Sequence, residues 1–259
     1  MTRIAHTLLL LLTLIVACGC DSDEKSTSAP AGETKITAAR QPKIPGPGEI
    51  VIAADLHVAL ARFNPDYNRQ AKFQLGLKGD IVDVTIKRCQ VSDLRGLTNL
   101  RLSVFEASHN PIEDLRPLKD MPIKKLYLVG TKVRDLSPLK GMPLNSLWLN
   151  DTPVEDIGPL KDTPLVSLTL AGTRVSDLSP LPRGKLERLH IGGTPVSDLT
   201  PLAGMQLTRL VFDPRRIKKG LDVVRNMTTL KELGLDLNTR MRPEEFWKLY
   251  DSDKLGAQR

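Results

Sequence analysis

Residues 123–143 read IKKLYLVGTKVRDLSPLKGMP, and the three blocks of 21 residues that follow repeat the pattern L-x-L-x-x-T-x-V-x-D-L-x-P-L without a residue gained or lost. Isoleucine replaces leucine at only two of these positions. The leading leucines are Leu126, Leu147, Leu168 and Leu189, and a threonine, a valine and a proline keep the same step in each block. A fixed period near 20 residues indicates stacked, similar units. Each unit is too short to bury its own apolar face and has to share contacts with its neighbours.

The first half of each unit predicts a short strand. Leucines at 126 and 128 alternate with Lys125, Tyr127 and Val129. Because successive side chains of a strand point to opposite faces, the leucines are expected to face the core and the other three residues to face outward.

The second half of each unit predicts a turn. The hydroxyl of Thr131, and of its counterparts in the other units, is expected to bond neighbouring backbone groups as a ladder. Asp135 is expected to accept backbone N–H bonds two or three residues further on and so to start a helical turn. Pro138 costs little there, because N–H groups of a first turn lack helical partners.

The period extends beyond these four blocks. The aspartate column runs from Asp93 to Asp198 in steps of 21, and Val84, Phe105 and Leu210 take the leading-leucine position. After Leu210 the phase slips, and the next leading leucine is Leu233, 23 positions on. We therefore predict repeats over residues 81–237.

Both ends of the repeat region carry sequences typical of caps. Residues 49–80 predict an N-terminal cap: a helix that Asn64-Pro65 ends, followed by a hairpin whose second strand, from Ile81, doubles as the first repeat strand. Residues 238–259 predict a C-terminal cap helix and tail, in which Phe246, Leu249 and Tyr250 lie over the last repeat.

The pattern resembles the leucine-rich repeat family, with L-x-x-L-x-L-x-x-N/T-x-L at 144–154, 165–175 and 186–196. The 21-residue length and the Asp-Leu-Ser-Pro-Leu half resemble the short bacterial variety. The resemblance covers roughly residues 81–237. It implies an α/β fold, a leucine-rich repeat solenoid in which a curved parallel β-sheet lines the inside and short helical or 3-10 turns lie on the convex side.

The first 48 residues predict export and attachment to a membrane. Arg3 precedes an apolar run from Leu8 to Ala17 that is too short to span a bilayer. Cys18 follows small residues at the end of that run, which resembles the bacterial lipoprotein signal, in which the cysteine is acylated. We therefore predict a signal peptide at 1–17 and lipidation of Cys18; an ordinary signal peptide cut nearby is the alternative. Residues 18–48 are poor in bulky apolar side chains and predict a disordered tether with a span of roughly 30 Å.

Composition argues against several classes of function. The net charge of +7 is spread over lysines and arginines interleaved with acids, whereas nucleic-acid-binding proteins concentrate basic residues on one face. The four histidines lack metal-ligand spacing, no G-x-S-x-G elbow occurs, and the glycines are not followed by a phosphate-binding lysine. The stacked aspartates suit capping better than a calcium site. We expect no enzymatic activity, no cofactor, no metal and no nucleic-acid partner. Three cysteines, one of them the predicted lipidation site, cannot form a disulfide framework, and Cys89 is expected to be buried.

The candidate binding site is the concave face of the predicted sheet. Its central outward column contains Tyr127 and Trp148 on adjacent strands, where their rings should touch. Tryptophan and tyrosine are enriched among binding anchors. The predicted site residues are an aromatic half, Tyr127 and Trp148 with Asn150 beside them, and a basic half, Arg188, His190 and Arg209.

The sequence thus predicts a non-enzymatic scaffold in the cell envelope, lipid-anchored at the periplasmic or outer surface, that binds a protein or peptide and is monomeric. A carbohydrate or cell-wall binding module, with Trp148 and Tyr127 stacked on sugar rings, is the first alternative. A structural spacer without a ligand is the second.

Overall fold

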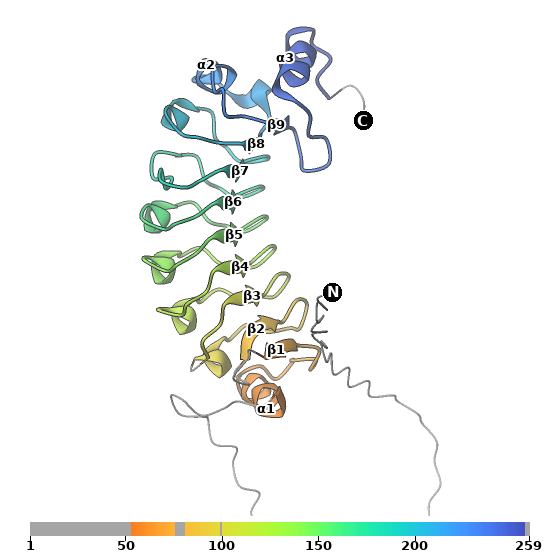
Figure 1. Cartoon of the computed structure of the whole chain (residues 1–259). Helices are drawn as coiled ribbons and strands as arrows, with labels where there is room; N and C mark the ends of the chain where they lie inside the picture. The colour runs from red at the N-terminus through yellow and green to blue at the C-terminus, as the bar shows by residue number, and fades with distance from the viewer. Residues whose placement is uncertain (1–52, 76–80, 99, 257–259) are drawn as a thin grey trace, which may run out of the picture. The chain divides into compact units, whose positions relative to one another are not determined.

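The computed structural model describes residues 53–75, 81–98 and 100–256. The predicted signal peptide, lipidation site and tether, together with residues 49–52 of the predicted N-terminal cap, lie outside the described residues. Within the described part, nine strands form one sheet in chain order (Figure 1). They are β1 (Lys72–Leu75), β2 (Ile81–Thr85), β3 (Val104–Glu106), β4 (Lys125–Tyr127), β5 (Ser146–Trp148), β6 (Ser167–Thr169), β7 (Arg188–His190), β8 (Arg209–Val211) and β9 (Glu232–Gly234).

The strands stack in the register that the repeat predicts. Strand β1 pairs antiparallel with β2, as predicted for these two segments, and every later neighbour pair from β2 to β9 is parallel. Leu126, Leu147, Leu168 and Leu189 are register partners along one buried row. The row continues across the predicted phase slip, because Leu210 pairs with Leu233. The continuous core lies between the sheet and the turns on the other side of each coil.

Short 3-10 turns run along that other side (Figure 1). They are η1 (Arg95–Leu97), η2 (Arg116–Leu118), η3 (Ser137–Leu139), η4 (Gly158–Leu160), η5 (Thr200–Leu202) and, in a different position, η6 (Pro214–Arg216). The coil between β6 and β7 has no such turn. The turns η2, η3, η4 and η5 are closed by a backbone N–H of the residue that follows them, but the corresponding residue in the exceptional coil is Pro182, which has no N–H to donate.

Each aspartate of the column lies one residue before the N-cap position of these turns, and Asp177 makes the same bond in the coil that has no 3-10 turn. Asp135 accepts the backbone N–H of Ser137 at 2.8 Å, and Asp177 accepts that of Ser179 at 2.8 Å. The serine hydroxyls donate to the same carboxylates at 2.7 Å. These bonds from the serine N–H and hydroxyl hold the pKa of Asp135 and of Asp177 below the ordinary value. The capping role predicted from the sequence is confirmed for the whole column, Asp93, Asp114, Asp135, Asp156, Asp177 and Asp198.

The threonine hydroxyls bond neighbouring backbone groups, as predicted, but each bond stays within its own coil and does not link one coil to the next. The Thr131 hydroxyl donates to the carbonyl of Leu128 in its own coil at 2.8 Å, and the other threonines repeat this local bond. In this column the side chain that joins two coils is Asn110, one unit upstream of Thr131. It accepts the N–H groups of Cys89 and Val91 and donates to the carbonyl of Ile86. A threonine is one bond shorter and reaches only the strand end that precedes it.

A column of residues with positive φ angles, at the turn that follows each strand, explains where the 21-residue period slips. Six residues spaced 21 apart have positive φ angles at the strand-end turn, namely Arg88, His109, Gly130, Asp151, Gly172 and Gly193. The next position is Pro214, whose ring fixes φ near −65°. The chain there leaves the turn used by the other coils and forms η6, followed by the helix α2 (Leu221–Arg225).

The N-terminal end is built from the helix α1 (Ala53–Phe63), which packs on η1, and the hairpin. At Gly96 the backbones approach so closely that a Cβ would lie 2.8 Å from the main chain of Ala59. Asn64 ends the helix, as predicted, and accepts the N–H groups of Ser92 and Asp93. Cys89 is buried nearby as a free thiol, as predicted, and burial raises its pKa.

The C-terminal end carries the helix α3 (Pro243–Asp251), at the position that the sequence predicts. Its buried face agrees with the prediction at Phe246 and differs from it at Trp247, which the prediction did not include. Phe246 and Trp247 are buried against Phe212, with ring centroids 5.8 and 6.5 Å away, whereas Leu249 and Tyr250 are only half-buried. Among the described residues, no helix has the length and apolar character needed to cross a membrane.

Candidate binding face

The outward-facing side chains of β3 to β9 form what we call the sheet face. Its central column follows the register of the strands: Glu106, Tyr127, Trp148, Thr169, His190, Val211 and Gly234. Exposure changes sharply along this column. Trp148 is 36% exposed, whereas Thr169 is 6% and Val211 is 0% exposed. The sheet face is therefore open over β4 and β5 and covered over β7 and β8.

The aromatic half of the predicted site is assembled on the open part. The rings of Tyr127 and Trp148 are in contact, as predicted, with centroids 5.2 Å apart and planes at 76°. Burial of the phenol, together with the nearby carboxylate of Glu106, raises the pKa of Tyr127. The phenol is thus neutral near pH 7 and available as a hydrogen-bond donor. Trp148 is the more exposed of the two rings and presents a large apolar surface to solvent.

Asn150 extends the aromatic pair. Its side-chain oxygen accepts a hydrogen bond from the hydroxyl of Thr169 on the neighbouring strand. Its amide nitrogen makes no hydrogen bond to another group of the described part of the chain, so it remains a donor for a ligand. The next residue, Asp151, is exposed, and its carboxylate lies over Gly172, where a Cβ would clash with Oδ1. Polar groups therefore border Trp148 on the turn side.

His190 does not belong to an exposed basic half, which corrects the prediction. It is 9% exposed, and burial lowers the pKa of its imidazole, although Asp236 and Asp151 oppose that shift. The imidazole is therefore mostly neutral near pH 7. Its Nδ1 is buried without a hydrogen-bond partner among the residues that the structure describes, and its Nε2 would lie 2.9 Å from a Cβ on Gly192. The glycine makes room for the buried ring.

The segment that follows β9 covers His190. This segment runs from Leu235 to Met241 and returns to the sheet, where Met241 and Leu233 exchange backbone hydrogen bonds of 2.8 and 3.0 Å. The carbonyl oxygen of Leu235 would lie 3.4 Å from a Cβ on Gly192, which places the segment over β7. The sequence contained one signal for this return: Asp236 accepts the N–H groups of Asn238 and Thr239, the turn that Asp-x-Asn-Thr favours.

The two predicted arginines are half-exposed and already paired. Arg188 makes an ion pair with Glu187 at 3.6 Å. Arg209 bonds to Glu232, a carboxylate that also faces Arg240 at 3.5 Å. The acids beside these arginines offset part of their positive charge. The structure therefore brings Tyr127, Trp148 and Asn150 together, but the surface next to them is not strongly basic.

The sheet face carries no arrangement typical of catalysis. In the ranges that the structure describes, no three His, Cys, Asp or Glu side chains lie close enough together to hold a metal ion. The polar groups around Trp148 are the amide of Asn150, the hydroxyls of Tyr127 and Thr169 and the carboxylate of Asp151. What this face offers chemically is apolar area with a few directional donors and acceptors.

Comparison with solved structures identifies the architecture. A crystal structure of internalin C2 from Listeria monocytogenes matches with a TM-score of 0.52 and 27% identity, over 68% of this chain and 80% of that one. A second internalin from the same organism, InlF, matches with a TM-score of 0.51 and 23% identity, over 76% and 69%. The chain has the leucine-rich repeat fold. No model of a known protein family matches it, and neither does any curated protein.

This fold confirms the predicted class, a curved parallel sheet with short 3-10 turns on the other side of each coil. Its structural neighbours are bacterial, as the sequence pattern predicted. Leucine-rich repeats present an extended surface on a rigid stack, and the curvature of such a stack is what creates room for a partner.

Proposed function

We propose that this protein is a non-enzymatic scaffold that binds another protein, or a peptide segment of one, through Tyr127, Trp148 and Asn150, and that it is displayed on the bacterial cell envelope as a lipoprotein anchored through Cys18. The observation that carries the binding proposal is the exposure of Trp148. Among the described residues, Val58 and Trp148 are the large apolar side chains counted as exposed. The same column is buried over β6, β7 and β8, and an exposed tryptophan is a typical anchor for a protein contact.

The surroundings of Trp148 support a protein partner. Tyr127 stiffens the ring by edge-to-face contact, which lowers the entropy lost when a partner packs against it. Asn150 and the Tyr127 hydroxyl add hydrogen-bonding groups at the border of the apolar area. Apolar anchors ringed by polar groups are the usual composition of a protein interface.

Sugar binding is supported less well by this geometry. Stacking on a sugar ring uses the flat face of an aromatic side chain, and a platform of two rings needs them nearly coplanar. The planes of Tyr127 and Trp148 instead stand at 76° to each other. One pair of variants distinguishes the protein-binding hypothesis from the sugar-binding hypothesis.

The test compares Trp148→Ala with Val58→Ala, a matched control because Val58 is also 36% exposed but lies on α1. Both variants and the wild type are immobilised and challenged with detergent-solubilised envelope and with a panel of wall glycans. We expect one envelope protein to bind the wild type and Val58→Ala, and to bind Trp148→Ala at least tenfold more weakly, since hot-spot residues contribute about 2 kcal/mol or more. Equal retention by all three proteins would overturn the proposal, and loss of glycan retention alone would favour the sugar module.

The anchoring proposal has its own test. The mass of the mature N-terminal peptide should show acyl chains on Cys18, and Cys18→Ala should move the protein from the membrane to the soluble fraction. Cys20→Ala is the control, because Cys20 lacks the preceding aliphatic residue that the lipidation signal needs. An unacylated N-terminus in the wild type would refute the anchor and leave the binding proposal standing.

A further inference from the structure

The open part of the sheet face carries more acidic than basic side chains, although the whole chain has a net charge of +7. Over β3 to β6 and the three residues that follow each strand, the carboxylates are Glu106 and Asp151, and the one lysine or arginine is Lys125. Lys125 begins β4, whereas Glu106 ends β3 and Asp151 follows the end of β5. The negative groups therefore lie at the strand ends, as Tyr127 and Trp148 do, and the positive group lies at a strand start.

The carboxylate of Asp151 is free to bind a cation. The residue is exposed, and its side chain makes no hydrogen bond or ion pair within the ranges that the structure describes. Its φ angle is +56°, and its backbone N–H donates to the carbonyl of Ala171 at 2.8 Å. This turn directs the carboxylate over Gly172, where the missing Cβ leaves room for it. The side chain is thus positioned by its backbone and not by a partner.

A second carboxylate reaches the same area from the returning segment. Burial lowers the pKa of His190, and the negative charges of Asp236 and Asp151 oppose that shift. Because Coulomb interactions weaken with distance, both carboxylates lie near the imidazole. Asp236 also accepts the N–H groups of Asn238 and Thr239. It therefore adds negative charge at the border between the covered and the open part of the sheet face, but Asp151 carries the free carboxylate.

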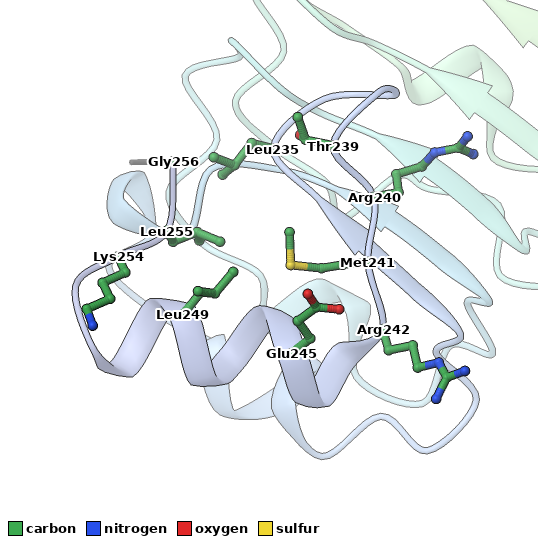
Figure 2. Close-up of a pocket in the computed structure, with 10 residues that line it drawn as sticks. All are labelled: Leu235, Thr239, Arg240, Met241, Arg242, Glu245, Leu249, Lys254, Leu255 and Gly256. Carbon is green, nitrogen blue, oxygen red and sulfur yellow. The ribbon is translucent and has the colours of Figure 1, made fainter. Parts of the chain in front are cut away.

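The arginines of the covered part lie at the other ends of the strands. Arg188 and Arg209 begin β7 and β8. Figure 2 shows the returning segment beside α3, where the side chain of Arg240 extends away from Leu235. Arg240 faces Glu232, the first residue of β9, at 3.5 Å. These cations therefore lie at strand starts and do not pair with the carboxylate that follows the end of β5.

Trp148 adds a surface that attracts cations on the same side as Asp151. The face of an indole binds a cation more strongly than the face of a phenol or a phenyl ring does. Tyr127 touches the ring from β4, whereas the neighbour of Trp148 on β6 is the small Thr169. Gly172, under the Asp151 carboxylate, belongs to the coil of β6. An aromatic face and a carboxylate are therefore offered to a ligand at one place.

The chain already uses this combination of groups to hold an arginine. The guanidinium of Arg225 lies 4.6 Å from the ring centroid of Trp247 and pairs with Asp251 at 2.7 Å. A second example at the N-terminal end joins the same three kinds of group, Arg95, Phe63 and Asp93. Trp148 and Asp151 supply the aromatic ring and the carboxylate without the arginine.

An arginine fits these two groups better than a lysine or an acid. Its guanidinium is planar, so it can stack on a ring while its N–H groups bond a carboxylate, whereas the ammonium of a lysine is a point charge. An acidic side chain would be repelled by Asp151 and by the negative face of the indole. The free amide nitrogen of Asn150 can donate to a backbone carbonyl of the segment that carries the arginine.

We propose that Trp148 and Asp151 bind an arginine side chain carried by an extended segment of the partner protein. The guanidinium stacks on the β6 side of the indole and pairs with the Asp151 carboxylate, and Asn150 donates to a carbonyl of the same segment. This inference rests on the proposed function and adds to it the chemistry of the partner's anchor residue.

The experiment selects peptides from a displayed library of random dodecapeptides on the purified mature chain. Peptides that bind Trp148→Ala at least about tenfold more weakly than the wild type are resynthesised, and their affinities are measured by fluorescence anisotropy. We expect each of them to contain an arginine. Replacing that arginine by citrulline, which keeps the shape but not the charge, should weaken binding to the wild type by about tenfold.

Two aspartate variants separate the local carboxylate from the general charge of the protein. Asp151→Asn should weaken the arginine peptides about three- to tenfold, and it should keep the turn because asparagine tolerates a positive φ. Asp162→Asn, the same change in the same coil just after η4, should leave their affinity unchanged. The citrulline peptides should bind the wild type and Asp151→Asn equally, since the carboxylate acts on the guanidinium. Thermal unfolding of each variant shows that the fold is kept, and the citrulline comparison needs the wild type alone.

Trp148-dependent peptides without an arginine would overturn the inference and leave the proposed function standing. So would arginine peptides whose affinity is indifferent to citrulline or to Asp151→Asn. A selection that yields no Trp148-dependent peptide would also overturn it, because a linear segment with an arginine then fails to bind this face. The envelope-binding test decides separately whether a folded partner binds there.

Discussion

At the scale of single residues, Asn110 and the threonines that replace it in later coils solve the same turn in different ways. The amide of Asn110 has a donor and an acceptor and binds groups in both its own coil and the preceding one. Each threonine satisfies one carbonyl in its own coil. The N-terminal coils, where α1 and the hairpin join the stack, therefore depend on a side chain that bridges units.

Asn110→Thr should show this difference. The shorter side chain leaves the buried N–H of Val91 without its acceptor and leaves that of Cys89 with only the carbonyl of Ile86, 3.1 Å away. We expect a loss of about 2–3 kcal/mol in the free energy of unfolding, measured by urea denaturation. Thr173→Ala, which removes one local hydrogen bond, should cost about 1 kcal/mol. Equal losses would contradict a bridging role for Asn110.

His190 makes stability depend on pH. Burial lowers the pKa of His190 in the folded state from its ordinary value of 6.5. At a pH well above 6.5 the imidazole is neutral in both the folded and the unfolded chain, so it does not reduce the free energy of unfolding there. As the pH falls below 6.5, the unfolded chain takes up the proton first, and the free energy of unfolding declines until the pH passes the folded-state pKa. In urea titrations between pH 5 and 8, the free energy of unfolding of His190→Gln should decline less steeply with falling pH than that of the wild type. His57, whose pKa is also lowered, remains in both proteins and cancels from the comparison.

At the scale of elements, the strands and turns were predictable and the returning segment was not. Each strand of three residues is fixed by an alternation that recurs in the neighbouring coil, so the column positions of Leu168 and Asp177 could be found from spacing alone. The exposure of a residue in such a column could not be predicted from spacing, because exposure depends on which segment crosses over that residue. His190 and Trp148 occupy the same column position, but residues 235–241, outside the period, cover only His190. Trp247 was missed for a related reason: its burial depends on Phe212, which lies in the coil where the phase slips.

Phe246→Ala tests whether α3 stabilises the last coils. Phe246 is fully buried and stacks on Phe212, so its removal leaves a cavity at the end of the sheet. We expect a loss of about 3–5 kcal/mol in the free energy of unfolding, with hydrogen exchange rising first in β8 and β9, where the N–H of Phe212 donates to Gly234. The half-buried Tyr250 is the control, because Tyr250→Ala should have a smaller effect. Faster exchange in β3 and β4 at the same time would show that α3 acts on the whole stack.

At the scale of the whole folded part, stability is transmitted from coil to coil. Each strand is hydrogen-bonded to the strands next to it in chain order, and the leading-leucine row is continuous from Val84 to Leu233. In such a stack each unit is stabilised by its own fold and by its two interfaces. A defect in one interior coil should therefore weaken the coupling between the coils on its two sides, while a defect elsewhere leaves that coupling intact.

The two tryptophans of the chain make this coupling measurable, since Trp148 is in β5 and Trp247 is in α3. Leu189→Ala in β7 places a cavity between them and should cost about 2–5 kcal/mol. Leu126→Ala in β4 removes an equally buried side chain but leaves both tryptophans on the same side of the defect. Urea unfolding is followed by fluorescence in the backgrounds Trp148→Phe and Trp247→Phe, each of which reports one end. The two midpoints should coincide in the wild type and in Leu126→Ala and separate in Leu189→Ala, because only there does the weakened interface lie between the reporters. Coincident midpoints in Leu189→Ala would mean that the stack unfolds as one cooperative unit, with coupling between coils stronger than the loss of a buried leucine.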